Sequence, residues 1–383
     1  MSSLPDRDPI ETNRAGGDDP DHSIDWLELE RITHRDPAGR GLASYAPYGA
    51  PLDRGQLRAA ACSLAKHAGT VGIVTGFCVQ LDHEVTAETD GPPGALFLAR
   101  ALLACDVDVV LITDRYALPL LTAGRELWRL DRARLLEFPC EEGEPFDPDR
   151  ASNESSGNER ADRWVRDFYS AQLSARGRDR PLSHLIAIER PGPSHTLESL
   201  AAQDRTGSPP LERFSREVPA AVRNICHTMR GKSINPWTAK THRLFEWIGE
   251  QNLPIHTIGI GDGGNELGMG RFAWEELTTA GSGPVGQIAC RIATDNTLIA
   301  GVSDWGAYGL ALALARLRGA TRAANTWHAR GQRELLEAIV RHTSAVDGLT
   351  LRHEATVDGL AMADYLRPLR DMRQCLGFDA GEP

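Results

Sequence analysis

The sequence predicts an α/β fold: a layered, mostly parallel sheet flanked by helices. Short apolar runs rich in Val and Ile recur along the chain, and each ends at a glycine or a charged residue. These runs do not alternate in polarity, which is typical of strands that are covered on both faces. Helical segments lie between the runs, and strands that alternate with helices are the pattern of layered α/β domains.

Five runs are predicted as buried strands, at residues 70–76, 107–114, 184–192, 255–264 and 296–306. Helices are predicted at residues 57–68, 92–105, 238–252, 305–319 and 331–345. The second helix opens with Pro92 and Pro93, which suit the first turn of a helix. The last helix has the amphipathic period of a surface helix.

The predicted domain organisation is an acidic, disordered leader over residues 1–22, followed by one large α/β domain over residues 23–383. Two polar stretches interrupt the pattern, at about residues 140–163 and 191–219. Both are predicted to be surface insertions or lids.

Composition narrows the functional class. A net charge of -11 argues against a general nucleic-acid binder, because no basic excess is present to neutralise phosphates. No apolar run approaches the ~20 residues that span a bilayer, and the N-terminus resembles neither a signal nor a transit peptide. The seven cysteines include no CxxC pair, which favours free thiols in a reducing compartment. We therefore expect a cytoplasmic protein that acts on a small molecule, and a homo-oligomer is compatible with the sequence.

Polar residues follow each predicted strand. Ligands bind beyond the carboxyl ends of the strands in open parallel sheets, so these residues are expected to share one pocket. The pairs Glu88 with Asp90, and Asp262 with Glu266, are typical of a hard cation or of acid–base chemistry. Asp90 also suits the cap of the helix that begins near residue 92, and Asp304 suits another helix cap.

The densest motif is "GIGDGGNELGMG", residues 259–270. A dinucleotide fingerprint needs a following helix and a distant acidic residue, and a P-loop needs Gly-Lys-Ser/Thr; this motif continues in neither way. We predict a strained turn that directs Asp262 and Glu266 into a pocket for a metal or an amino acid. A purely structural turn is the alternative.

The motifs "ETDGPPGA", "LITD", "IERPG", "MRG", "GIGDGGNELGMG" and "AGVSDWGAYGLALAL" occur in this order between about residues 69 and 318. Together they resemble the D-glutamate cyclase C-terminal domain family. The resemblance implies cyclisation of D-glutamate to 5-oxo-D-proline with loss of water, assisted by Mg²⁺ or Mn²⁺. The chain departs from the family pattern in lacking an Asp-Gly after "ERPG", in having Ser233 in place of an aspartate, and in having Asp304 in place of an asparagine.

This resemblance and the strand ends give a working assignment of roles. The predicted metal ligands are Glu88, Asp90 and Asp262, and the predicted catalytic residues are Glu266, Asp304, Arg190 and Arg230. Predicted substrate contacts are Thr75, Gly263, Gly264, Asn265, Ser303 and Trp305. In this assignment Glu266 moves a proton, and Arg190 or Arg230 holds the substrate carboxylate. Two alternatives stay open: a related metal-dependent enzyme for another amino dicarboxylate, and a metabolite-binding module that has lost catalysis.

Overall fold

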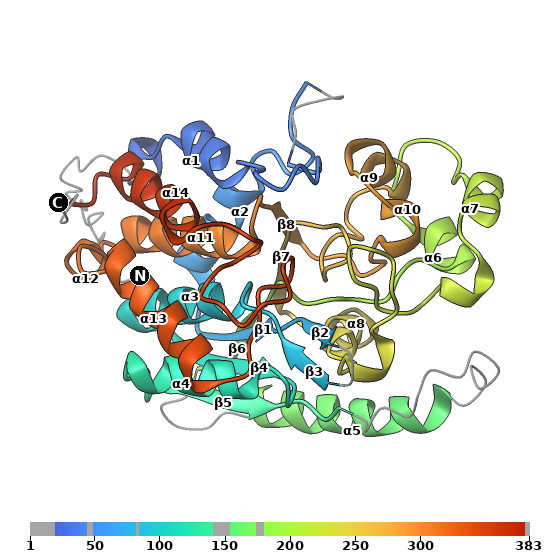
Figure 1. Ribbon diagram of the computed structural model, residues 1–383, viewed down its shortest axis with the longest axis horizontal. Helices are drawn as coiled ribbons and strands as arrows, with labels where there is room; N and C mark the ends of the chain where they lie inside the picture. The colour runs from blue at the N-terminus through green and yellow to red at the C-terminus, as the bar shows by residue number, and fades with distance from the viewer. Residues whose placement is uncertain (1–19, 44–48, 82–83, 141–153, 174–179, 380–383) are drawn as a thin grey trace, which may run out of the picture.

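A six-stranded parallel sheet forms the centre of the molecule (Figure 1). The computed structural model describes residues 20–43, 49–81, 84–140, 154–173 and 180–379. The strands are β1 (Thr70–Thr75), β4 (Asp108–Thr113), β5 (Ala133–Glu137), β6 (Leu182–Ile188), β7 (His256–Gly261) and β8 (Asn296–Ile299), in the order β5-β4-β1-β6-β7-β8. Every neighbouring pair is parallel. The predicted layered α/β fold is confirmed.

Each of the five predicted runs overlaps a strand. Strand β6 begins two residues before its run and ends at Ile188, and β8 is also shorter than predicted. Strand β8 ends at Ile299, and helix α11 begins at Ser303, inside the predicted run. The edge strand β5 was not predicted, because its half-exposed residues form no continuous apolar run. A small antiparallel hairpin of β2 (Cys78–Leu81) and β3 (Glu84–Ala87) was also not predicted.

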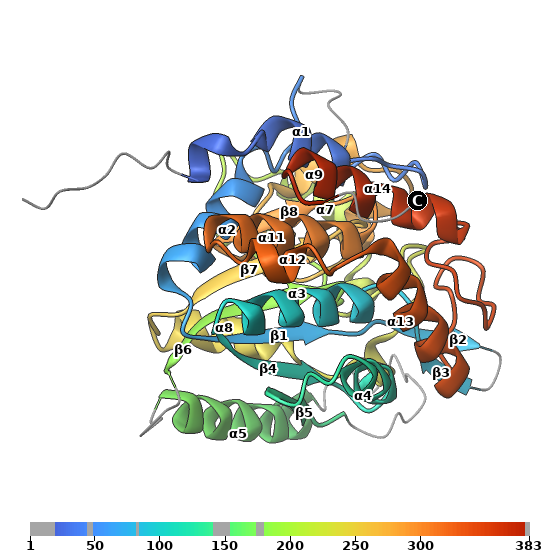
Figure 2. The ribbon, with the colours of Figure 1, turned by 90° about the vertical axis from the view of Figure 1, so that its left-hand side faces the viewer.

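Helices cover both faces of the sheet (Figure 2). The first face carries α1 (Trp26–Thr33), α2 (Gln56–His67), α3 (Pro92–Ala104), α4 (Leu118–Leu127), α11 (Ser303–Leu317), α12 (Thr321–Ala324), α13 (Ala329–His342) and α14 (Met362–Cys375). The other carries α5 (Glu154–Leu173) and α8 (His242–Glu250). Strand side chains alternate between two cores: Ile73 of β1 contacts the first core and Val74 the second.

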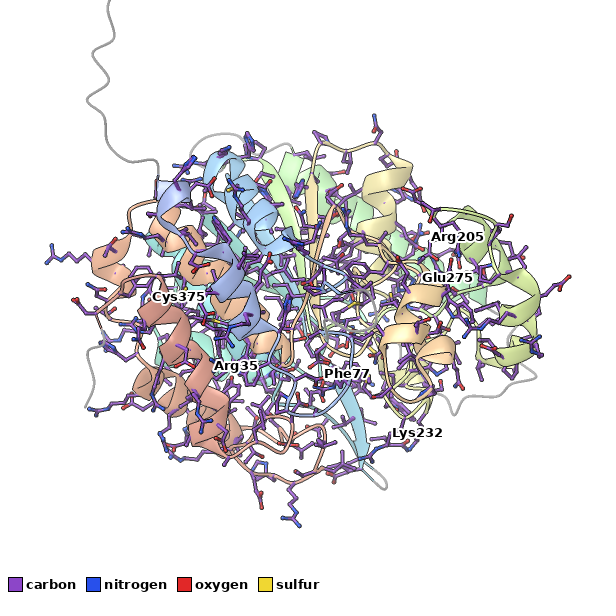
Figure 3. The ribbon with its side chains drawn as sticks, turned by 90° about the horizontal axis from the view of Figure 1, so that it is seen from above. Arg35, Phe77, Arg205, Lys232, Glu275 and Cys375 are labelled. Atoms are coloured by element: carbon purple, nitrogen blue, oxygen red, sulfur yellow. The ribbon has the colours of Figure 1, made fainter. Side chains whose placement is uncertain are left out.

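A lobe of short helices extends the second core beyond β7 and β8 (Figure 1). Its helices are α6 (Leu197–Ala202), α7 (Leu211–Glu217), α9 (Trp274–Ala280) and α10 (Val285–Ile288). The polar stretch 191–219 supplies α6 and α7, which bury Leu200 and Phe214 completely. An ion pair between Arg205 and Glu275 joins this stretch to α9 (Figure 3). Single 3₁₀ turns occur at Pro20–Ser23, Ala220–Val222 and Asn235–Trp237.

The strand order places a crevice at the carboxyl edge of the sheet. From β1 the chain proceeds through β4 to β5, and then crosses to β6 on the other side of β1. Loops that leave β1 and β6 therefore diverge, and such a switch point is where doubly wound sheets bind ligands. The side chains predicted from the strand ends lie at this edge.

Parts of two sequence predictions lie outside the described residues. The predicted leader is described only from residue 20, and of the stretch 140–163 only Cys140 and the part from Glu154 onward are described. Among the described helices, none is long and apolar enough to cross a membrane.

Candidate active site

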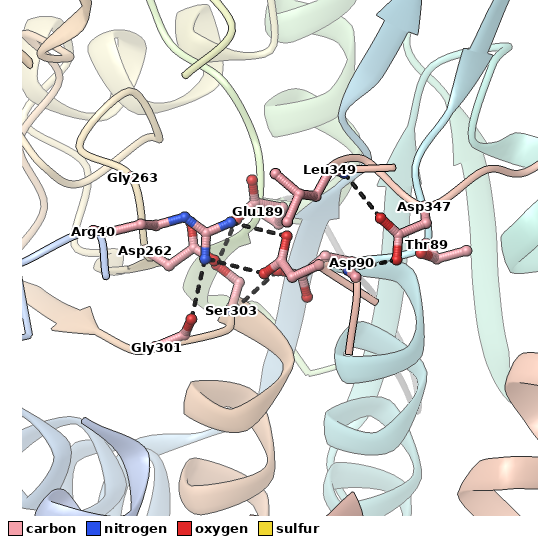
Figure 4. A network of polar contacts seen from close by, with 12 residues as sticks. Arg40, Thr89, Asp90, Glu189, Asp262, Gly263, Gly301, Ser303, Asp347 and Leu349 are labelled. Atoms are coloured by element: carbon pink, nitrogen blue, oxygen red, sulfur yellow. Dashed lines mark hydrogen bonds and ion pairs between the residues drawn. The ribbon is translucent and has the colours of Figure 1, made fainter. Parts of the chain in front are cut away.

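Buried carboxylates from distant parts of the chain converge at the carboxyl edge of the sheet (Figure 4). Carboxylate oxygens of Asp90, Asp262 and Asp358 lie within 4.8 Å of one another, and so do those of Glu189, Asp262 and Glu266. All five residues are buried, and Asp262 belongs to both groups. The structure thus brings together three acidic residues predicted for the site and adds Glu189 and Asp358.

The glycine-rich motif forms a tight loop after β7, and Glu266 shapes it. The Glu266 carboxylate accepts hydrogen bonds from the backbone N–H groups of Gly263 and Gly264, both at 2.8 Å. Gly264 has a φ of +92°, which a residue with a Cβ rarely adopts. A Cβ on Gly263 would lie 2.1 Å from the sulfur of Met229 and 2.7 Å from the Oδ1 of Asn265, so glycine lets the Met229 side chain pack closely on this turn.

Asn265 connects the same two loops. Its Nδ2 donates to the carbonyl of His227 at 2.8 Å. Its Oδ1 is buried and has no hydrogen-bond partner among the described residues. Thr75, at the end of β1, has a buried Oγ1 that also has no hydrogen-bond partner among the described residues. Buried polar atoms are nearly always paired, so these two oxygens are candidates for contact with a bound ligand.

Asp90 and Asp304 cap helices, although not the helices nearest to them in sequence. Asp90 accepts from the N–H groups of Ser303 and Asp304 at the start of α11, both at 3.1 Å. Asp304 accepts from Gly91 at 3.1 Å and Gly94 at 2.7 Å at the start of α3. The sequence interpretation that Asp90 caps the helix near residue 92 therefore needs correction: Asp90 accepts from Gly91, but its other two bonds cap α11.

Asp304 also contacts a buried tyrosine. Its Oδ2 accepts from the hydroxyl of Tyr365 at 2.6 Å, and Tyr365 in turn contacts the hydroxyl of Tyr308. Burial raises the pKa of Asp304 to about 7, against the opposing effect of the Tyr365 hydrogen bond and the backbone donors. Trp305 lies in the core beside this pair, where its Nε1 donates to the carbonyl of Tyr365 at 2.9 Å.

Glu189 is held in an unusual backbone conformation at the end of β6. Its φ is +43°, a region that residues with a Cβ seldom occupy outside functional or strained positions. Its Oε2 accepts from the hydroxyl of Ser303 at 2.5 Å. Burial raises the pKa of Glu189 well above its ordinary value, and the nearby Asp262 and Glu266 raise it further. The sequence placed Glu189 at a strand end, but no motif singled it out.

The pKa values of four further carboxyl groups rise for the same reason. Burial is the largest cause for Glu88, Asp90, Asp262 and Glu266. Repulsion from neighbouring carboxylates adds to it for Glu88, Asp90 and Asp262. Glu88 packs against the loop that contains Gly348. A Cβ added to this glycine would lie 1.7 Å from the Oε2 of Glu88.

Arg40 supplies a cation to this cluster and was not predicted. Its guanidinium bonds both oxygens of Asp358, at 3.0 and 2.8 Å, and its Nη1 lies 3.0 Å from Asp262 (Figure 4). Attraction to Asp262 and Asp358 raises the pKa of Arg40 despite burial, so it stays charged. Arg40 and Asp358 lie 318 positions apart in loops without a recognisable motif, and only folding brings them together.

The two predicted arginines lie elsewhere. Arg190 is fully buried and makes four hydrogen bonds, to Thr241, Ala239, Gly76 and Asp114, with its Nη1 2.5 Å from the Asp114 carboxylate. Arg230 is exposed on the loop 227–231 and donates to the carbonyl of Leu349 at 3.4 Å. None of the hydrogen-bond partners named for these two arginines is a member of the two carboxylate groups.

Comparison with known proteins agrees with the arrangement of these motifs. The family model "D-glutamate cyclase-like, C-terminal" matches residues 29–205 and 215–373. The chain belongs to this family. The predicted resemblance is confirmed, and the matched ranges include both Arg40 and Asp358.

One relative is mitochondrial D-glutamate cyclase from Homo sapiens. It is 31% identical over 290 residues, which are 75% of this chain and 38% of the human protein. This chain therefore matches well under half the length of that D-glutamate cyclase. The cytoplasmic location expected from the sequence stays a prediction.

The donor set fits the divalent cation that this family implies. Carboxylate and amide oxygens are the ligands that Mg²⁺ and Mn²⁺ prefer. Asn265 offers an unpaired buried oxygen, and the Oδ2 of Asp262 is buried with an ion pair to Arg40 but no hydrogen bond. Asp262 is the one residue shared by both groups of oxygens, so it is the natural centre of such a site.

Proposed function

We propose that this chain cyclises D-glutamate to 5-oxo-D-proline with loss of water, a lyase-type reaction. The observation that carries the proposal is the convergence of buried carboxylates on Asp262 beside Arg40, in a member of the D-glutamate cyclase-like family. The substrate is a dicarboxylate with an amine, so a site with one cationic and several acidic groups offers partners for both kinds of charge.

The reaction forms a bond between the α-nitrogen and the carbon of the γ-carboxylate, and breaks a C–O bond of that carboxylate. The substrate ammonium must first lose a proton, and the departing oxygen must gain protons to leave as water. A carboxyl group with a raised pKa suits both transfers. Glu189 and Glu266 both have raised pKa values and lie within reach of Asp262.

Glu189 is the stronger candidate for this proton transfer. Both oxygens of Glu266 already accept backbone N–H groups of the glycine loop, so its main effect is to shape that loop. Glu189 has one oxygen bound to Ser303, which leaves the other for the substrate amine. In this scheme Ser303 orients the carboxyl group of Glu189. Glu266, predicted to move the proton itself, contributes only indirectly by holding the shape of the glycine-rich loop.

Asp262, with Asp90 and Asp358, would hold the divalent cation. Glu88, which the charges of Asp358 and Asp262 influence, and Asn265, with its unpaired oxygen, are proposed to complete the set. Bound there, Mg²⁺ or Mn²⁺ would polarise the γ-carboxylate as a Lewis acid. Asp304 is proposed to act indirectly, because it fixes the start of α3 beside Asp90.

Arg40 is proposed to bind the α-carboxylate of the substrate, since it is the arginine that contacts the carboxylate cluster. Its two terminal nitrogens already bond Asp358, and its Nε makes no hydrogen bond among the described residues, so Nε is the donor proposed for the substrate carboxylate. Arg230, which is exposed and donates to the carbonyl of Leu349, is proposed to attract an anionic substrate. Thr75 would contact the bound substrate through its unpaired hydroxyl.

The test is incubation of the purified protein with D-glutamate, with and without Mg²⁺ or Mn²⁺, followed by mass spectrometry for 5-oxoproline. The expected result is cation-dependent product from the D-enantiomer, and a much slower reaction of Asp262→Asn. A parallel panel of L-glutamate and other amino dicarboxylates separates the proposal from its alternative. Turnover of another substrate but not of D-glutamate would contradict it.

A further inference from the structure

A second cavity lies apart from the carboxylate cluster, on the side of the sheet that carries α8. Its volume is about 310 Å³, and none of its lining residues belongs to the cluster. The lining comes from α5, from the loop that precedes α8, from the first turns of α8, and from Arg291. A cavity of this size is at the lower end of small-molecule sites.

Basic side chains line this cavity. Lys240, Arg243 and Arg291 lie beside two carboxylates, Asp162 and Glu246, so the lining has a formal excess of one positive charge. The chain as a whole has a net charge of -11, so the sign of this excess is opposite to that of the molecule. A local positive field in a cleft concentrates anionic ligands.

Carboxylates hold both arginines in place, and Arg291 keeps a free donor. Arg243 donates through Nε, Nη1 and Nη2 to Asp162, Glu246 and Glu250. Glu246 accepts from Arg243 at 2.6 Å and from Arg291 at 2.5 Å, so one carboxylate fixes both guanidinium groups. Arg291 also donates its Nε to Asn224 at 3.0 Å. Its Nη2 makes no hydrogen bond among the described residues, and neither does the ring of His242, which lines the same cavity. Fixed cations with free donors are what recognition of an oxyanion needs.

The loop before α8 is rigid because Arg190 holds it. Arg190 donates to the carbonyl of Ala239 and to the hydroxyl of Thr241, both at 2.9 Å. Thr241 is the N-cap residue of α8, and its hydroxyl makes no cap bond to the helix. The start of α8 therefore adds its partial positive charge to that of the side chains around the cavity.

We propose that this cavity is a second ligand site, which binds a small oxyanion, the carboxylate or phosphate group of a small metabolite. Lys240, Arg291 and His242 are its recognition groups. This site shares no residue with the proposed active site, so binding at it does not depend on the cyclase activity.

The experiment is isothermal titration calorimetry of the full chain with inorganic phosphate and, separately, with succinate. Lys240→Gln and Arg291→Gln are compared with the parent, and Lys66→Gln, on the exposed end of α2, is the matched control. Arg291→Gln leaves Glu246 paired with Arg243, which protects folding; circular dichroism of each variant checks this.

The expected result is saturable binding of one probe per chain, about tenfold weaker in each basic variant, because a charge-assisted hydrogen bond is lost. Lys66→Gln and Asp262→Asn should bind like the parent. A preference for phosphate or for succinate identifies the group that the site takes. The proposal is overturned if neither probe binds saturably, if both basic variants bind as the parent does, or if Asp262→Asn abolishes binding.

Discussion

Asp90 caps helix α11, in whose first turn Asp304 lies. Asp304 in turn caps helix α3, which follows Asp90 in the chain. Asp90 binds the first N–H groups of α11, and Asp304 binds those of α3. The two helix N-termini therefore meet at the edge of the sheet, where their partial positive charges face the acidic cluster. Gly94 permits this meeting, because a Cβ there would lie 2.6 Å from the Asp304 carboxylate.

This reciprocal arrangement makes Asp304 important for stability. Asp304→Ala should lower the free energy of unfolding by about 3 kcal/mol, since it removes a cap and leaves buried donors unpaired. Urea unfolding measures the change. Thr196→Ala removes the ordinary cap of α6 and should cost about 1 kcal/mol, so it is the matched control. Equal losses in the two variants would argue against the reciprocal cap.

Arg190 is expected to act on stability rather than on substrate binding. Arg190→Gln leaves Asp114 as an uncompensated buried charge and should cost about 3–5 kcal/mol in the free energy of unfolding. Arg213→Gln, which breaks an exposed pair with Glu217, should cost under about 1 kcal/mol. If Arg190→Gln were as stable as the control and had a raised KM for D-glutamate, Arg190 would be the substrate arginine.

Arg40 is expected to determine substrate affinity. Arg40→Lys keeps the charge but loses the planar fork, and KM for D-glutamate should rise about tenfold or more, with a smaller change in kcat. Steady-state kinetics and calorimetric binding of 5-oxo-D-proline measure the effect. Arg58→Lys, at an exposed pair with Asp21, serves as the control. An unchanged KM would remove Arg40 from the substrate site.

Cation binding should strengthen as pH rises. Burial and mutual repulsion raise the pKa values of Asp90 and Asp262, so these groups hold protons at a pH where ordinary carboxyl groups have lost them. A cation needs the ionised forms and must release those protons. Mn²⁺ affinity should therefore continue to increase above the pH at which ordinary carboxyl groups are fully ionised. Titrations in two buffers of different ionisation enthalpy count the protons, and an affinity independent of pH would contradict the prediction.

His184 should make the protein less stable in mild acid. Burial lowers the pKa of His184 to about 4, from 6.5 in the unfolded chain. Between these values the unfolded chain binds the additional proton, so stability falls as pH drops through this window. The raised pKa values of the buried acidic cluster change stability in the opposite direction as pH drops. A His184 variant is therefore needed to isolate the effect of His184. His184→Gln should lose about 3 kcal/mol less than the parent over this range, whereas the exposed His342→Gln should behave like the parent.

Much of the fold was predictable from local sequence. Continuous apolar runs identified β1, β4, β6, β7 and β8, because a strand buried on both faces needs an apolar side chain at nearly every position. The edge strand β5 was missed because its exposed side needs no such run. The glycine loop was also predictable, since its conformation depends on residues that lie next to one another.

The sequence alone thus determined the sheet, its main helices and the position of Asp262 and Glu266 at a strand end. Only the tertiary structure decided which groups face them. Arg40, Asp358 and the exchange of caps between Asp90 and Asp304 join segments more than 200 positions apart. Such pairings leave no local pattern, because a loop residue is selected by its partner across the site and not by its neighbours along the chain.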